Sequence, residues 1–278
     1  MIGAYNALSG TLYFLGDFEA VHQYAMRGVQ ISRSESLQSQ VQEVSASAVS
    51  VLCYEAQAKW HLGETASSQT TVAEAISLAK SMNDMPGLAV ELWQAAGFAY
   101  YEGNPAEVER LASDLIELST RQNFAHWLPH GEVLRGWARS TSGDAVQGIS
   151  WIVDGIEDFR ATGAHRCVPF FLALKAEALH LADRTFEALE AIREAEGLVE
   201  RFEERLWRAD VHRLRGVFLG AMGADETQIE ASFCEAIRTA REQKSIPLAR
   251  RAEASYAEYR SKKQAGQKDL APPNFRPA

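Results

Sequence analysis

Two histidines and a carboxylate near the middle of the chain have the residue types of a metal site. His126 and His130 are four positions apart, and Glu132 follows closely. Two histidines at this spacing on one helix share a face and can ligate the same metal ion. Pro129 lies between them, however, at the expected start of a helix, and no third ligand follows at a suitable spacing. We therefore interpret these residues as the polar start of a helix and predict no metal site.

Cys53 and His61 are the other candidate pair, a thiol with an imidazole. Eight residues along a helix separate them by about 12 Å, which is too far for proton transfer. Cys167 and Cys234 have no local partner, and three cysteines without a CxxC pair argue against a disulfide framework or a thiolate zinc site. A glycine-rich phosphate loop is missing as well. The sequence thus predicts no catalytic residues, no cofactor and a protein that is not an enzyme.

The composition indicates a helical protein in a reducing compartment. The 278 residues carry a formal net charge of −9, and alanine, the best helix former, is abundant. An acidic balance argues against nucleic-acid binding, which needs basic residues to displace counterions from phosphates, and against binding to anionic membranes. No apolar stretch is long enough to span a membrane, and the N-terminus has no basic segment typical of a signal peptide. We expect a cytoplasmic protein.

A short turn recurs along the chain between stretches of helical character. With one residue of each turn taken as its anchor, the anchors recur about every 40 residues after a longer first interval. Most anchors are glycine, which tolerates the left-handed backbone found at helix ends, and the remaining one is an aspartate. The anchors are Gly16, Gly63, Gly103, Gly143, Asp183 and Gly223.

Small residues stand at fixed distances on both sides of these anchors. The helix before each anchor carries Ser9, Ala56, Ala96, Gly136, Ala176 or Gly216. The helix after each anchor carries Gly28, Ala75, Leu115, Gly155, Ala195 or Ala236, with leucine as the one larger residue. Small residues at matching points let two antiparallel helices approach closely. The sequence therefore predicts six helix pairs, of which the fourth spans residues 127–142 and 145–161.

This pattern resembles tetratricopeptide repeats, which are two-helix units with a small residue in each helix and glycine at the turn. The resemblance implies an all-α, right-handed α-solenoid of about six helix pairs. A charged thirteenth helix at about 247–263 suits a solvated capping element. We expect the helical-repeat domain to cover residues 1–264, and a proline-rich, disordered tail to cover 265–278.

A narrower resemblance rests on residues 124–127, 134–138 and 159–164. They look like the C-terminal tetratricopeptide region of bacterial signalling proteins in which a class III nucleotide cyclase and an AAA-type ATPase module precede the repeats. Neither catalytic module is recognisable in this chain. The resemblance implies a non-catalytic scaffold that binds a protein or peptide partner in its concave groove. The alternative is a regulatory or sensory segment of a larger cyclase or ATPase signalling protein.

In stacked units of this kind, the first helix of each pair lines the concave surface. By this resemblance, aromatic residues of successive first helices form one exposed strip, with polar residues toward its C-terminal end; core packing is the competing interpretation. The predicted partner-binding residues are Tyr13, Trp60, Trp93, Tyr100, Trp137, Glu177, His180 and Arg213.

The first predicted helix also has an apolar outer face, formed by Tyr5, Leu8, Leu12, Tyr13 and Phe14. Terminal units of a solenoid usually need a polar outer face. We therefore expect this N-terminal edge to contact a second copy of the chain or an upstream module.

Overall fold

The computed structural model describes residues 1–33 and 43–269, and within these ranges every regular element is a helix. Six antiparallel helix pairs are followed by a single long helix, as predicted. The helices are α1 (Ile2–Leu15), α2 (Phe18–Ser32), α3 (Glu43–His61), α4 (Thr65–Ser81), α5 (Met85–Tyr101), α6 (Pro105–Gln122), α7 (Leu128–Thr141), α8 (Ala145–Ala161), α9 (Val168–Leu181), α10 (Thr185–Phe202), the 3₁₀ helix η1 (Arg205–Trp207), α11 (Arg208–Ala221), α12 (Glu226–Glu242) and α13 (Ile246–Asp269).

All six predicted anchor residues have the left-handed backbone conformation that ends a helix. Their φ angles are positive and range from 60° at Asp183 to 103° at Gly143. Glycine adopts this conformation without the penalty that a Cβ atom imposes, and aspartate tolerates it better than most residues. The predicted turn register is therefore confirmed, and the fourth helix pair lies within one residue of its predicted bounds.

The residue directly after an anchor often starts the next helix. Asp17, Asn104 and Asp144 each accept a hydrogen bond from a backbone N–H in the first turn of α2, α6 and α8, at 3.1 to 3.3 Å. A short polar side chain at this position satisfies an amide that has no partner within the helix. Local sequence alone thus fixes where one helix ends and the next begins.

The small residues allow the two helices of a pair to approach closely. A Cβ atom added at Gly136 on α7 would lie 2.6 Å from the carbonyl oxygen of Gly148 on α8. A Cβ atom at Gly148 would lie 2.3 Å from the carbonyl oxygen of Gly136. Glycine at both positions is therefore required by the close backbone approach of α7 and α8.

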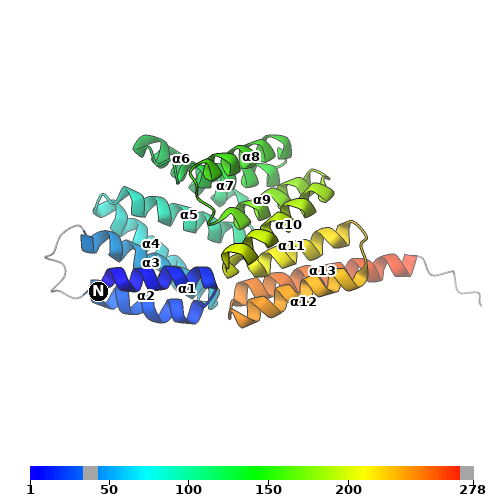
Figure 1. Ribbon diagram of the computed structural model, residues 1–278, viewed down its shortest axis with the longest axis horizontal. Coiled ribbons are helices and arrows are strands. Elements are labelled where there is room, and N and C mark those ends of the chain that lie inside the picture. The colour runs from blue at the N-terminus through cyan, green and yellow to red at the C-terminus, as the bar shows by residue number, and fades with distance from the viewer. Residues whose placement is uncertain (34–42, 270–278) are drawn as a thin grey trace, which may run out of the picture.

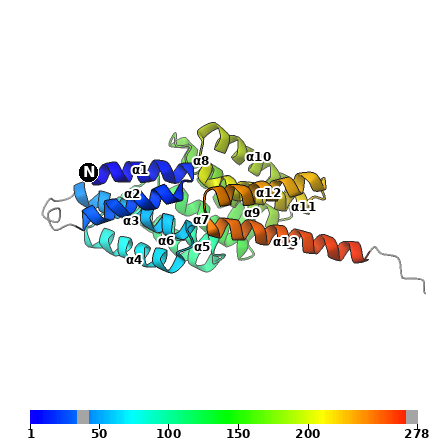
Figure 2. The same cartoon turned by 90° about the horizontal axis from the view of Figure 1, so that it is seen from below.

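The stacked pairs curve until the C-terminal units return to the N-terminal ones. The α1–α2 turn lies beside the α12–α13 turn in both views (Figures 1 and 2), and α13 contacts α3 while η1 contacts α1. Lys244 forms an ion pair with Glu19, and the imidazole Nδ1 of His61 lies 2.8 Å from Ser245 Oγ. These contacts close the solenoid into about one turn.

The last helix is longer than predicted. α13 continues to Asp269, past residue 264, where we expected the repeat domain to end. Residues 270–278, which belong to the predicted disordered tail, lie outside the described residues. Across the described ranges, no helix is both long and apolar enough to cross a membrane.

At the N-terminal edge, the expected apolar face is only partly exposed. Leu8 is 45% exposed, whereas Tyr13 is buried and Leu12 and Phe14 are half-buried. The inward-facing side chains of α1 pack against α3, because the first helices of successive pairs stack on one another, and the end of α1 also lies beside η1 where the solenoid closes. The contact of this edge with a second copy or another module stays a prediction.

Candidate functional site

The predicted partner-binding residues all lie on the first helices of the pairs, here called the A helices. Tyr13 lies on α1, Trp60 on α3, Trp93 and Tyr100 on α5, Trp137 on α7, Glu177 and His180 on α9, and Arg213 on α11. Consecutive A helices contact one another from α1 through α11. The resemblance therefore placed these residues on the correct helices.

Their expected exposure is wrong, because these aromatic side chains are buried. The exposed fraction is 5% for Tyr13, 3% for Trp60, 8% for Trp93, 1% for Tyr100 and 6% for Trp137. The closure of the solenoid turns the rings of neighbouring A helices onto one another, and the start of α13 enters the same space. An open aromatic strip is consequently replaced by packed clusters.

The centre of the closed turn contains an ion network formed by Glu177, Asp210, Arg213 and Arg251, here called the inner ion network. Arg213 donates to Asp210 Oδ1 at 2.6 Å through Nε and to Glu177 Oε1 at 3.0 Å through Nη2. Arg251 of α13 donates to Glu177 Oε1 at 3.2 Å, and its Nε lies 3.7 Å from Asp210 Oδ1. Two arginines thus balance two carboxylates that come from α9 and α11.

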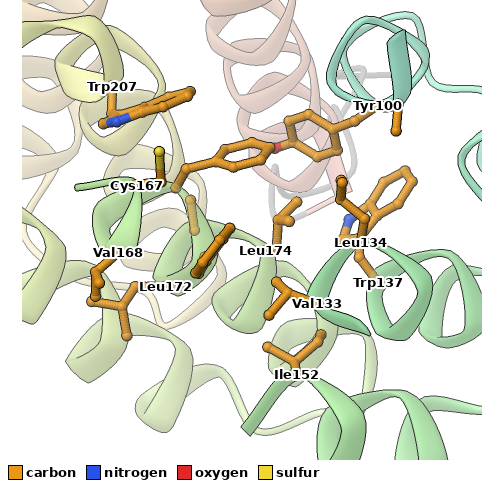
Figure 3. Close-up of a cluster of buried hydrophobic side chains, with 14 of the residues drawn as sticks. Tyr100, Val133, Leu134, Trp137, Ile152, Cys167, Val168, Leu172, Leu174 and Trp207 are labelled. Atoms are coloured by element: carbon orange, nitrogen blue, oxygen red, sulfur yellow. The ribbon is translucent and has the colours of Figure 1, made fainter. Parts of the chain in front are cut away.

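Two of the predicted aromatic residues bind this network directly. Trp137 Nε1 donates to Glu177 Oε2 at 2.8 Å, and the Tyr100 hydroxyl donates to Asp210 Oδ2 at 3.2 Å. Their rings meet edge to face, with centroids 4.9 Å apart. Figure 3 shows both residues beside Leu134 and Leu174 in the buried cluster. The structure therefore brings together Tyr100, Trp137 and the predicted polar residues Glu177 and Arg213.

The charges of Asp210, Arg213 and Arg251 in the inner ion network are fixed over the physiological range. Burial by itself would raise the pKa of Asp210, but Arg213 and Arg251 outweigh burial and lower the pKa to about 2. Interaction with Tyr100, Asp210 and Glu177 raises the pKa of Arg251 above that of a free guanidinium, although burial opposes this. A group that does not titrate near neutral pH is a poor general acid or base. The network therefore serves to hold α9, α11 and α13 together.

The other predicted residues lie in separate clusters. Trp60 stacks on Phe98 at a centroid distance of 5.4 Å, and the Tyr13 hydroxyl donates to Gln57 Oε1 at 2.9 Å. His180 Nδ1 lies 2.9 Å from Thr185 Oγ1, near the C-terminal end of α9. None of these three residues contributes to the inner ion network.

Trp93 lines a cavity on the inner side of the A helices, here called the inner cavity. It has a volume of about 480 Å³ and lies between α1, α3, α5, the segment before α7 and the α8–α9 connection. Its walls include the aromatic side chains of Phe14, Tyr54, Trp93, Trp127 and Phe159. This volume is within the range of small-molecule and peptide side-chain pockets.

A second, more open cleft of about 820 Å³ adjoins the inner cavity and is here called the outer cleft. The two spaces share part of their lining, namely Asn6, Phe14, Tyr54, His165 and Arg166. The outer cleft continues along α1 toward the end of α10 at Arg201 and Phe202. An occupant can therefore extend from the enclosed space into the open one.

Two residues that line the inner cavity each have a polar atom without a partner. The Nε1 atom of Trp93 and the Oδ1 atom of Asn6 are both buried, and neither makes a hydrogen bond to a described residue. Both atoms are inaccessible to solvent, so they lie behind the cavity surface rather than on it. Leaving such a group unpaired costs about 1–3 kcal/mol.

Two titratable groups at this wall, His130 and Cys53, are held neutral. Burial lowers the pKa of His130 to about 3, and its Nδ1 donates to the His126 carbonyl oxygen at 2.9 Å. Burial raises the pKa of the Cys53 thiol, to which Gln94 Nε2 donates at 2.8 Å. The arrangement suits binding of an apolar group with hydrogen-bonding capacity rather than nucleophilic or acid–base chemistry.

Sequence reasoning missed Asp210, Arg251 and Arg166. The first of these had a usable signal, because Asp210 and Arg213 have the spacing of an ion pair on one helix face. The other two had none, since Arg251 reaches Glu177 only through the closure of the solenoid and Arg166 lies in a connection. Three of the inner-cavity aromatic residues, Phe14, Tyr54 and Trp127, were likewise not predicted.

Comparison with other proteins gives one sequence relative and several structural ones. No family model matches the chain. An uncharacterized protein of Rhizobium meliloti (strain 1021) is 24% identical over 199 residues, which make up 72% of this chain and 19% of the relative. The chain therefore spans about a fifth of the length of this relative.

Two solved structures resemble the chain over most of its length. The apo form of RapI has a TM-score of 0.58 at 12% identity and covers 95% of this chain and 99% of its own. Bacillus thuringiensis PlcR, solved in complex with the peptide PapR7 and DNA, has a TM-score of 0.58 at 14% identity and covers 85% of this chain and 83% of its own. At these identities the likeness concerns the fold. The chain thus shares with these structures an all-α fold, which in its described residues is a solenoid of stacked helix pairs.

Proposed function

We propose that the chain is a non-catalytic binding module that holds a peptide segment of a protein partner in the inner cavity and the outer cleft. The observation that carries this proposal is the inner cavity of about 480 Å³, which opens into the outer cleft and shares part of its lining with it. A peptide segment can place one side chain in the cavity while its main chain lies in the cleft. The aromatic walls favour an apolar side chain in the cavity.

The neighbouring structures support this class of partner in general terms. PlcR was solved with a bound peptide, which is a property of that protein and concerns this chain only through the shared fold. The same structure contains DNA. The acidic net charge of this chain argues against a nucleic-acid partner, but that inference stays a prediction. Its cytoplasmic location stays a prediction as well.

The proposal is tested by selecting peptides from a displayed library on the purified chain and measuring their affinity by titration calorimetry. Ala164→Trp should fill the inner cavity and Trp93→Phe should remove part of its aromatic wall, and each should weaken binding at least tenfold. Ala125→Trp, at an exposed position, and Trp151→Phe, in a separate pocket between α6, α7 and α8, serve as matched controls. Selected peptides whose affinity is unchanged by both test variants would bind elsewhere, and the proposal would then be wrong.

The second candidate function is that of a regulatory segment within a larger signalling protein. The supporting observation is the Rhizobium meliloti relative, in which the matching region is a fifth of a much longer chain. The resemblance of residues 124–164 to repeats that follow cyclase and ATPase modules favours the same interpretation. Reading the coding sequence upstream tests it: a cyclase or ATPase module in frame supports this role, and an unrelated or absent module contradicts it.

A further inference from the structure

The junction between the inner cavity and the outer cleft carries an arginine without an ionic partner. Arg166 lines both spaces, and its guanidinium lies over the ring of Phe14 at 4.5 Å from the ring centroid. No described residue lies within ion-pair distance of it. This isolation contrasts with most arginines of the chain, which pair with Asp or Glu, as Arg160 does with Glu194 on the outer surface.

The two carboxylates near this junction have partners other than Arg166 within hydrogen-bond or ion-pair distance. Glu204 is 6% exposed, and its Oε2 accepts from the Cys167 backbone N–H at 3.3 Å and from Trp207 Nε1 at 3.2 Å. Glu203 Oε2 lies 3.8 Å from Arg205 Nη2. A second arginine of the outer cleft, Arg201, stacks on Phe202 at 5.2 Å. Burial raises the pKa of Glu204, and its two hydrogen bonds and the nearby charge of Arg166 offset part of this rise. The mouth of the inner cavity therefore presents one arginine whose charge is only partly balanced, on a chain whose net charge is −9.

An ion pair at this point would be oriented by its surroundings, although Arg166 itself is an exposed residue. The Phe14 ring covers one face of the Arg166 guanidinium and keeps it in place over the cavity mouth. A planar guanidinium can bind a carboxylate through two parallel hydrogen bonds, which fixes the direction of approach. The apolar walls begin immediately inside, at Tyr54 and Trp93. The two kinds of contact are thus adjacent and can select for an acidic group next to an apolar one.

We propose that the inner cavity and the outer cleft together recognise an internal peptide segment in which an acidic side chain stands next to a bulky apolar residue. The apolar side chain enters the inner cavity, the carboxylate pairs with Arg166, and the main chain runs along the outer cleft. An internal segment fits because the outer cleft is open along α1 and toward the end of α10, so the main chain can continue in both directions. This assignment rests on the proposed peptide-binding function and adds the specificity of the site.

The test compares three probes on the full chain by titration calorimetry. The first is acetyl-Ala-Glu-Leu-Phe-Ala-amide, and the second carries glutamine in place of glutamate. The third is the glutamine peptide with a free terminal carboxylate. The glutamate peptide should bind at least tenfold more tightly than the glutamine peptide. Arg166→Gln should abolish that difference, Arg160→Gln should preserve it, and Arg166→Lys should restore part of it.

The outcomes separate this assignment from the function on which it rests. Equal binding of the glutamate and glutamine peptides, with both weakened by Ala164→Trp, overturns the acidic specificity and leaves peptide binding in place. Preference for the free terminal carboxylate that depends on Arg166 also overturns it, because the anion would then be a chain end. Failure of all three peptides to bind overturns both proposals. A tenfold preference that Arg166→Gln removes supports both.

Discussion

A buried carboxyl group on α5 should make the stability of this protein fall as the pH rises. Glu91 has no exposed surface, and neither of its carboxyl oxygens makes a hydrogen bond to a described residue. Burial raises its pKa from 4.5 to about 8, and the neighbouring Cys53 thiol offsets only a small part of this. The folded protein therefore keeps Glu91 protonated at neutral pH.

The sign of the effect follows from the two states. In the unfolded chain the carboxyl group ionises near pH 4.5, whereas in the folded chain it stays protonated until about pH 8. The unfolded state thus binds fewer protons between these values, so the contribution of Glu91 to stability is greatest below pH 4.5 and is lost as the pH rises to 8. Each pH unit in that window costs about 1.4 kcal/mol, which amounts to about 3 kcal/mol at pH 7.

Glu91→Gln keeps the shape of the side chain and removes its ionisation. Urea unfolding at pH 5, 6, 7 and 8 should show that the variant gains stability relative to the natural chain by about 3 kcal/mol between pH 5 and pH 7. The buried amide also changes the free energy of unfolding by an amount that does not depend on pH. The test is therefore how the difference in unfolding free energy between the variant and the natural chain changes with pH, and not its value at any one pH. Glu117→Gln, at a position with a 70% exposed side chain, is the control and should leave the pH profile unchanged. Parallel profiles for Glu91→Gln and the natural chain would refute the reasoning.

Three further predictions concern packing, the inner ion network and the cysteines. Gly136→Ala should destabilise the chain by about 1–3 kcal/mol in urea unfolding, because its Cβ atom would meet the carbonyl oxygen of Gly148. Gly197→Ala, which adds a Cβ atom in open space on α10, should instead stabilise it by up to about 1 kcal/mol; equal effects of the two substitutions would contradict the packing argument. Arg251→Gln should cost about 1.5–3 kcal/mol through the loss of charged hydrogen bonds, and an unchanged unfolding midpoint would show that α13 is not held by this residue. Of the three cysteines, only the exposed Cys234 should react with a thiol reagent such as DTNB in the native chain, since burial raises the pKa of the other two, and all three should react after unfolding.

The repeat was predictable because its determinants are local. A left-handed backbone at Gly143 or Asp183 depends on that residue and its immediate neighbours. The cap supplied by Asp144 depends on an amide three residues away. The spacing of about 40 residues also places Trp137 and Glu177 at the same register of successive A helices, and these two side chains do form a hydrogen bond.

The exposure of the inner face could not be predicted in the same way. Whether Trp60 or Tyr100 faces solvent depends on how the small rotations between successive units add up over the whole chain. The positions of residues within the repeat give no information on this total rotation. Once the helix pairs complete about one turn, both Trp60 and Tyr100 are buried. The same closure brings Arg251 of α13 to Tyr100, with the guanidinium 4.7 Å from the ring centroid, although the two are far apart in sequence.

The closed arrangement assigns different roles to residues that look equivalent in the sequence. Trp93 and Trp137 both lie on inner faces of A helices and are both buried, yet only the indole N–H of Trp137 has a partner, Glu177. A donor that is already paired within the inner ion network contributes to holding the turn closed. The unpaired donor of Trp93 is buried behind the cavity wall and carries a cost in the folded chain. Since Arg251 lies in the inner ion network and the inner cavity stays open beside α1, the residues that hold the turn closed are separate from those proposed to bind a partner.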